Sequence, residues 1–211
     1  MEITWYGHSC FRVTERGMPS IVSDPFDHES VGYKSLKLKG DIVTVSHDAP
    51  GHNFVKGVKG YQWDLRGPGE YEIGGIFITG VGTKDSKKDR NLVFVYDYEG
   101  VTVAHLGDME HVPTQTQIEA FGNVDVLLVP VGGGKALNAA KAAEVIALIE
   151  PGVVIPMHYK TDDSELKLNP IRQFLLEMGL TAAKAKPQPS LKVTESTVPE
   201  ETEVIVLDVA A

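Results

Sequence analysis

The sequence predicts an α/β protein built as a four-layer sandwich, in which two β-sheets pack face to face and helices lie outside them. Two observations predict this fold. The first half of the 211 residues consists mainly of short β-rich runs separated by Gly, Pro and Ser. The second half alternates buried strands with helices, and each half finishes in helices. The length suits one domain over residues 1–211.

Apolar and polar residues alternate along the predicted strands of the first half, and these strands end in polar turns. They span residues 2–6, 11–13, 21–23 and 42–46, and the β-rich pattern continues over 71–81. A turn at 97–100 joins strands 92–96 and 101–106 as a hairpin. The stretch 83–90 mixes basic with acidic residues and is predicted to be a solvated loop.

Two helices of the second half have capping signals in the sequence. Thr114 and Gln117 form a capping box for a helix that ends at residue 121. Asn169 is expected to cap a helix through residue 178, with Pro170 at its first position and Gly179 closing it. The other predicted elements are buried strands at 124–131 and 153–157, an Ala-rich helix at 138–149, a linker at 184–190 and late strands at 191–193 and 204–209.

Composition and charge exclude several classes of protein. One Cys leaves no internal disulfide framework. Lys and Arg number 20 against 29 Asp and Glu, so the net charge of −9 repels phosphodiester backbones and we expect no nucleic-acid partner. The longest apolar stretch, 126–131, is far shorter than the roughly 20 residues that span a bilayer, and residues 1–6 lack the basic start of a signal peptide. We therefore expect no membrane association and a cytoplasmic location.

Histidines gather just beyond the predicted strands. Five of the seven lie there: His47, His52, His105, His111 and His158. A rigid strand followed by a loop can turn several imidazoles toward one point, and Asp108 lies among them in the sequence. A single His after a strand is more often a surface residue or a hydrogen-bonded core residue. Several at strand ends, together with a carboxylate, predict a site for a divalent metal ion.

Motifs along most of the chain carry a resemblance to a known family. They are Tyr6-Gly7-His8-Ser9-Cys10-Phe11, Ser23-Asp24-Pro25-Phe26, Gly67-Pro68-Gly69-Glu70-Tyr71, His105-Leu106-Gly107-Asp108, Pro130-Val131-Gly132-Gly133-Gly134 and Pro156-Met157-His158-Tyr159. On these motifs the chain resembles the metallo-β-lactamase-fold superfamily, and within it small bacterial metal-dependent hydrolases related to ascorbate-6-phosphate lactonase. The resemblance implies the four-layer αββα sandwich of that superfamily.

The metal-binding loop departs from the family pattern His-x-His-x-Asp-His. The corresponding segment here is His47-Asp48-Ala49-Pro50-Gly51-His52, so Ala49 replaces a His and Gly51 replaces the Asp. A further family His is also missing, at a position near Lys84. By resemblance, the first of two metal positions keeps only His47 and a share of Asp108. The second keeps three protein ligands, which are His52, Asp108 and His158.

The resemblance therefore implies a hydrolase with a reduced, single-metal site. His52, Asp108 and His158 would hold one divalent ion, with His47 nearby as a fourth ligand or a base. Zinc is the expected metal, with manganese or iron as alternatives, and the substrate would be a small-molecule ester, lactone or phosphoester. The residues expected to surround and orient the ligands are His8, Asp24 and His105, and two residues that could swing in to refill the site are Asp48 and His111.

The sequence also allows a second function and disfavours a third. Because the losses fall on metal ligands while turn glycines such as Gly132 are kept, the chain could instead be a metal-free scaffold that binds a ligand or regulates a partner. A nuclease is disfavoured by the acidic net charge and by the absence of a basic or aromatic-rich insertion. A homo-oligomer is expected only by analogy with small proteins of this fold.

Overall fold

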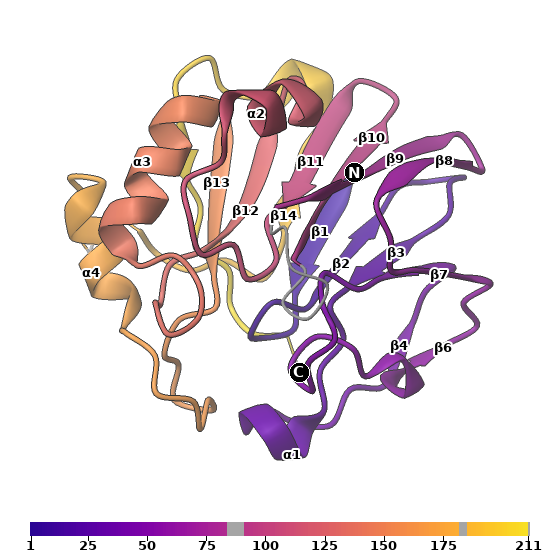
Figure 1. Ribbon diagram of the computed structural model, residues 1–211, viewed down its shortest axis with the longest axis horizontal. Helices are drawn as coiled ribbons and strands as arrows, with labels where there is room; N and C mark the ends of the chain where they lie inside the picture. Colours follow the sequence, from indigo (N-terminus) through magenta and orange to yellow (C-terminus); the bar gives the residue numbers. More distant parts are fainter. Residues whose placement is uncertain (84–90, 182–184, 211) are drawn as a thin grey trace.

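The computed structural model describes residues 1–83, 91–181 and 185–210. Two β-sheets stack on each other (Figure 1). Within the described residues, a six-stranded sheet has the order β14 (Leu191–Lys192), β1 (Glu2–Trp5), β2 (Phe11–Thr14), β3 (Ile21–Ser23), β5 (Ile42–Thr44) and β7 (Trp63–Leu65). The same parts of the chain form a seven-stranded sheet in the order β15 (Glu203–Val204), β13 (Val153–Met157), β12 (Val126–Pro130), β11 (Val101–His105), β10 (Leu92–Tyr98), β9 (Ile76–Gly82) and β8 (Gly69–Ile73). A small parallel pair joins β4 (Leu38–Lys39) to β6 (Val58–Lys59).

Each large sheet contains a block of parallel strands. β3, β5 and β7 run parallel in the first sheet, and β11, β12, β13 and β15 run parallel in the second. Their registers pair Ser23 with Thr44, and His105 with Leu128. Because parallel strands end at the same edge of a sheet, the loops that follow them meet there. This edge carries the candidate site.

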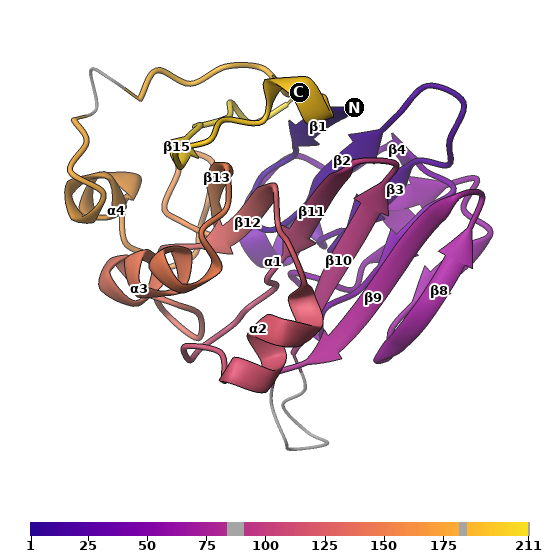
Figure 2. The same ribbon diagram turned by 90° about the horizontal axis from the view of Figure 1, so that it is seen from above.

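Helices cover mainly the second sheet. They are α2 (Gln115–Phe121), α3 (Ala139–Ile149) and α4 (Ile171–Glu177), and Figure 2 shows them on one side of β11 to β13 with the first sheet on the other side. Among the described residues, the outer face of the first sheet is covered by the short α1 (His28–Val31), the β4–β6 pair and a 3₁₀ turn at Val55–Gly57. A second 3₁₀ turn lies at Glu195–Thr197. The predicted sandwich is confirmed.

The alternating residues of the first sheet fill two separate hydrophobic clusters. Ile21 and Ile42 face the second sheet, in a cluster that also contains Phe94, whereas Val22 and Val43 pack in the outer cluster. The outer cluster also contains Phe26, Val31, Tyr33, Leu36, Leu38 and Val58. Burial of large apolar side chains, worth about 1.5–3 kcal/mol each, therefore covers the first sheet without a long helix.

The capping predictions are confirmed for α2 and for the end of α4, where Gly179 has φ of +68° and its N–H donates to the carbonyl of Leu176, but the predicted N-cap of α4 is wrong. Thr114 accepts a hydrogen bond from the backbone N–H of Gln117, and the Gln117 side chain accepts one from the backbone N–H of Thr114. Pro170, not Asn169, is the N-cap of α4. The backbone of Asn169 is used elsewhere, because its N–H donates to Gly132 and its carbonyl accepts from Lys160. These bonds hold Asn169 outside the helix.

Several predicted strands have different boundaries in the structure. The β-rich run 71–81 is a hairpin of β8 and β9, which turns at Gly74 and Gly75 with φ of +59° and +87°. Strand β5 ends at Thr44 because the N–H of Ser46 donates to the Asp24 side chain instead of to a strand. The hairpin predicted at 97–100 is confirmed. The loop predicted at 83–90 lies almost entirely outside the described residues, and so does the start of the 184–190 linker.

None of the helices in the described ranges has the length and apolar character that crossing a membrane requires.

Candidate metal centre

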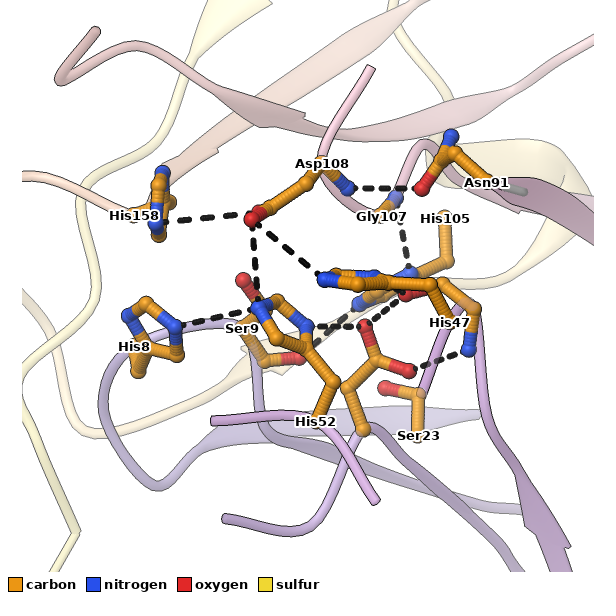
Figure 3. A network of polar contacts seen from close by, with 12 residues as sticks. His8, Ser9, Ser23, His47, His52, Asn91, His105, Gly107, Asp108 and His158 are labelled. Atoms are coloured by element: carbon orange, nitrogen blue, oxygen red, sulfur yellow. Dashed lines mark hydrogen bonds and ion pairs between the residues drawn. The ribbon is translucent and has the colours of Figure 1, made fainter. Parts of the chain in front are cut away.

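Side chains from four loops converge at the shared edge of the two sheets (Figure 3). His8 comes from the turn between β1 and β2, and His47 and His52 come from the loop after β5. Asp108 follows β11, and His158 follows β13. The four residues that were predicted to bind a metal therefore lie together, and His8 joins them.

Asp108 is the centre of the cluster. Its Oδ2 atom lies 3.3 Å from Nε2 of His52 and 3.7 Å from Nε2 of His47. Its Oδ1 atom lies 3.7 Å from Nε2 of His158 and has no hydrogen-bond partner in the described parts of the chain. Three imidazole Nε2 atoms thus face a single carboxylate.

The Asp24 side chain fixes the orientation of His52. Its Oδ2 atom lies 2.8 Å from Nδ1 of His52 and accepts a hydrogen bond of 2.6 Å from the Ser46 hydroxyl. Its Oδ1 atom accepts from the backbone N–H of Ser46 at 2.7 Å. Because an ionised carboxylate only accepts hydrogen bonds, Nδ1 of His52 carries the hydrogen. This turns Nε2 of His52 toward Asp108, which is the orienting role expected for Asp24.

His105 supports the site from behind. Its Nε2 atom donates to the carbonyl of Ser9 at 2.8 Å, and its Nδ1 atom accepts from the N–H of Gly107 at 3.2 Å. Both ring nitrogens are therefore used. His105 holds the turn that carries Asp108 and has no nitrogen left to bind a metal.

Asn91 also belongs to the site, although no sequence motif predicts it there. Its Oδ1 atom accepts a hydrogen bond of 2.9 Å from the backbone N–H of Asp108, and its amide nitrogen donates to the carbonyl of Leu106 at 3.0 Å. Asn91 is buried. A polar residue directly before the apolar strand β10 was the only available signal, and polar residues commonly precede strands.

Three residues of the site have strained backbones. Within the described residues, five non-glycine residues have positive φ, and His8 at +50°, Asp24 at +43° and His158 at +52° are among them. Left-handed conformations cost free energy for residues with a Cβ atom, and such strain collects at functional sites. These backbone conformations therefore lower the stability of the fold while they position the three side chains.

Two carboxylates, the buried Asp24 and the partly buried Asp108, determine the charge of the cluster. Burial raises the pKa of Asp108, but His52 and His158 outweigh burial and hold that pKa well below its ordinary value. Burial lowers the pKa of His52, but the carboxylates of Asp108 and Asp24 outweigh it and raise the pKa to about 10. Burial is also the largest cause of the lowered pKa values of His8, His47 and His158. These three imidazoles are thus neutral at pH 7, which is the form that binds metals.

The donor set fits a divalent cation. One nitrogen each from His8, His52 and His158 lie within 4.8 Å of one another, and so do donor atoms of His47, His52 and Asp108. Among the described residues, Oδ1 of Asp108 is a buried oxygen without a hydrogen-bond partner. Such an atom costs free energy unless a bound ion satisfies it. Imidazole nitrogen and carboxylate oxygen are ligands that zinc accepts, and manganese and iron accept them too.

The cluster lies in a cavity of about 970 Å³. This volume is at the upper end of the range for small-molecule sites. Its walls include the basic residues Arg66, Lys135 and Lys167 and the acidic residues Asp48 and Glu110. Arg66 is paired with Asp64 at 2.7 Å. A small molecule can therefore reach the histidine cluster.

Not all the predicted site residues reach the cluster. The His111 side chain is 73% exposed, and its Nε2 atom lies 4.0 Å from a carboxylate oxygen of Glu110. Asp48 lines the cavity but accepts a hydrogen bond from the Asn53 side chain. Neither of them takes the place of the missing ligands at Ala49 and Gly51. The position near Lys84 lies outside the described residues.

Stacked sheets whose parallel strands bring histidines and an aspartate to one edge define a protein of the metallo-β-lactamase class. The family described as the beta-lactamase superfamily domain matches residues 2–158. The chain belongs to this superfamily.

Individual relatives agree with this assignment. A UPF0173 protein of Pyrococcus furiosus is 30% identical over 187 residues, covering 76% of this chain and 84% of that protein. A UPF0173 metal-dependent hydrolase of Natranaerobius thermophilus is 24% identical over 201 residues, covering 79% of this chain and 90% of that protein. A Thermotoga maritima crystal structure, described as a candidate Zn-dependent hydrolase of the metallo-beta-lactamase superfamily, has 38% identity and a TM-score of 0.80 over 98% of this chain and 97% of that chain. Since an archaeal protein is among these relatives, the resemblance is not confined to bacterial hydrolases.

Proposed function

We propose that this protein is a metal-dependent hydrolase that holds one divalent ion and acts on a small-molecule ester, lactone or phosphoester. The observation that carries the proposal is the convergence of His47, His52 and His158 on Asp108 inside an open cavity. The relatives described as metal-dependent hydrolases support it. Zinc is the proposed ion because its preferred ligands are these residue types.

The hydrogen bonding of His52 favours one ion over two. Both groups of donor atoms, one with His8 and His158 and one with His47 and Asp108, include His52. The Nδ1 atom of His52 is hydrogen-bonded to Asp24, so only Nε2, which faces His8 and Asp108, can bind an ion. A single imidazole nitrogen has one lone pair and binds one ion. The two groups therefore compete for the same nitrogen of His52.

A bound divalent ion would supply an acidified water and polarise the attacked carbonyl or phosphoryl oxygen. The chain's own residues would prepare that position. Asp24 orients His52, and His158 supplies a neutral nitrogen beside Asp108, whereas His52 would release its Nε2 proton when the ion binds. His47 is the most exposed of the histidines around Asp108, with 20% of its side chain accessible, so it is the residue placed to bind the ion from the cavity side or to accept a proton.

The cavity wall carries charges of both signs. Lys135 and Lys167 line it together with Asp48 and Glu110, and the whole chain has a net charge of −9. An anionic substrate would be attracted by the two lysines and repelled by the two carboxylates. The charges of the wall therefore do not select one class among the proposed esters, lactones and phosphoesters.

Metal content per chain tests the proposal. Protein purified without a His tag and dialysed against metal-free buffer should hold about one divalent ion after reconstitution with zinc, because His52 can serve only one. His158→Ala should lose it, and the exposed His111→Ala should keep it. Absence of metal after reconstitution with zinc, manganese or iron(II) would overturn the proposal.

The missing ligands at Ala49 and Gly51 support a second function, a scaffold that binds a ligand without catalysis. It predicts that a panel of lactones and phosphoesters is not hydrolysed, even by protein that holds its metal. Turnover that disappears in His158→Ala would reject it.

A further inference from the structure

We infer that His8 is a direct ligand of the proposed ion and occupies the space that a side chain at position 51 would need. This inference rests on the proposed function, since it presupposes that an ion binds. It assigns the fourth protein ligand to His8, beside His52, Asp108 and His158. His47 is then left as the proton acceptor on the cavity side.

The first observation is a steric one at Gly51. A Cβ atom built there would lie 2.8 Å from Nε2 and 3.2 Å from Cδ2 of His8. The backbone of Gly51 is not among the glycines with positive φ, so its conformation alone does not require glycine. The His8 ring therefore fills the region into which a residue at position 51 would project, which is where the family pattern has its Asp.

The second observation is the distance between His8 and His52. Their Nε2 atoms lie 3.2 Å apart. Two nitrogens bound to one tetrahedral zinc, at about 2.0–2.1 Å each, are separated by about 3.3 Å. The observed separation thus matches that of two ligands of one ion, and the two Nε2 atoms face each other (Figure 3).

The third observation is the contrast between His8 and His105. Both side chains are buried, and the backbone satisfies both ring nitrogens of His105. Within the described residues, the Nδ1 atom of His8 has no hydrogen-bond partner, and its Nε2 atom is hydrogen-bonded to Nε2 of His52, another member of the cluster. A histidine kept for structural reasons is expected to be hydrogen-bonded at both ring nitrogens, as His105 is. The His8 ring is therefore hydrogen-bonded only to another proposed ligand.

The backbone shows how firmly His8 is placed. Its φ of +50° is strained, and the preceding Gly7 has φ of +100° and packs against the Tyr33 ring. The carbonyl of His8 accepts hydrogen bonds of 3.0 Å from the Trp5 indole and 3.0 Å from the N–H of His158. The second bond ties the position of His8 to that of another proposed ligand.

Four variants test the inference through metal affinity rather than activity. They are His8→Ala, Gly51→Asp, the double variant and the control His111→Ala. Zinc affinity is measured by competition with a chelator, and the visible spectrum of the cobalt(II) form reports the ligand set. Circular dichroism shows which variants are folded.

His8→Ala is expected to weaken zinc binding roughly 100-fold or more, since loss of a group that only orients a ligand already costs 10–100-fold. Gly51→Asp alone should also weaken binding, because its side chain meets the His8 ring. The double variant should recover affinity to within about 10-fold of the wild type, because the new carboxylate at position 51 can enter the space left by the missing His8 ring. His111→Ala should bind as the wild type does.

The outcomes separate the two proposals. If the wild-type protein binds no metal, the proposed function fails. If the wild type binds zinc and folded His8→Ala binds it equally well with an unchanged cobalt(II) spectrum, the inference about His8 fails and the proposed function stands. If His8→Ala does not fold, the double variant decides: a folded double variant without recovered affinity overturns the inference.

Discussion

The backbone N–H of His158 donates a hydrogen bond to the backbone carbonyl of His8, with 3.0 Å between the two atoms. This bond joins the loop after β13 in the second sheet to the turn between β1 and β2 in the first sheet. The two imidazoles are thus held in one frame although 150 residues separate them, as their numbers show. The metal centre depends on how the sheets are packed, and not on either sheet alone.

Gly132→Ala should disrupt that frame. A Cβ atom at position 132 would lie 2.2 Å from the carbonyl oxygen of His158 and 2.8 Å from Cα of Tyr159. Both are backbone atoms, so the loop itself must move. We expect the free energy of unfolding to fall by about 1–3 kcal/mol, as in other overpacked sites, and zinc affinity to fall with it.

Urea unfolding and chelator competition measure the two effects of Gly132→Ala. The matched control is Gly82→Ala, at a strand position where an added Cβ meets no atom within 4 Å. Wild-type zinc affinity in Gly132→Ala would show that the His158 loop is not held by this contact.

The fold was predictable because its signals are local. The alternation of β1 and β2, the apolar runs of β12 and β13 and the capping box at Thr114 each act over a few residues. The prediction failed for the N-cap of α4, since Asn169 makes backbone hydrogen bonds to Gly132 and Lys160, which are distant in sequence. A cap that is predicted from neighbouring residues takes no account of hydrogen bonds to residues far along the chain.

The site was partly predictable for the same reason. Strand ends identify His47 and His158, because the sequence marks where strands stop. The sequence gives no indication that His8 fills the space beside Gly51, since this contact is between residues of different loops. Asn91 was missed because its side chain bonds to the backbone of Asp108, and the sequence does not show that the two residues are neighbours in space. His111 also follows a strand, as the predicted ligands do, but its side chain faces solvent.

Asp24→Asn should weaken metal binding without removing a ligand. The Asp24 carboxylate accepts hydrogen bonds from His52 and from Ser46, and an amide in its place would present an N–H group to one of these donors. Loss of a residue that orients a ligand typically costs 10–100-fold in metal affinity, and we expect a decrease in that range. Chelator competition with zinc measures it.

Asp41→Asn is the matched control for Asp24→Asn. Asp41 also accepts from the N–H and the hydroxyl of a serine, Ser20, each at 2.8 Å, and does not line the cavity. Its variant should bind zinc as the wild type does. Equal affinities for the two variants would mean that the orientation of His52 does not depend on Asp24.

Metal removal should lower thermal stability. An ion that binds only the folded state adds about 2.7 kcal/mol when its free concentration is 100 times Kd. For a chain of this size, that corresponds to a rise in Tm of roughly 5–10 °C. Differential scanning calorimetry with excess zinc and with a chelator measures the change. His158→Ala should show no such difference, and a wild type whose Tm ignores zinc would argue against binding.

Alkaline pH should destabilise the protein through Tyr98, which lies far from the metal centre. Burial is the largest cause of the raised pKa of Tyr98, and its hydroxyl donates to the carbonyl of Pro19 at 3.1 Å. Because the folded-state pKa lies above the unfolded value of about 10, this contribution to stability is complete below that pH. It is lost as the pH rises further, since the unfolded chain releases the proton more readily.

Urea unfolding between pH 8 and pH 11 tests this dependence. Tyr98→Phe should be less stable than the wild type at pH 8 by about 1 kcal/mol, the worth of one hydrogen bond. Above pH 10 its stability should fall less steeply, because the variant has one fewer buried group to keep protonated. The partly exposed Tyr61→Phe is the control and should follow the wild-type curve. Parallel curves for Tyr98→Phe and the wild type would mean that Tyr98 does not contribute to alkaline unfolding.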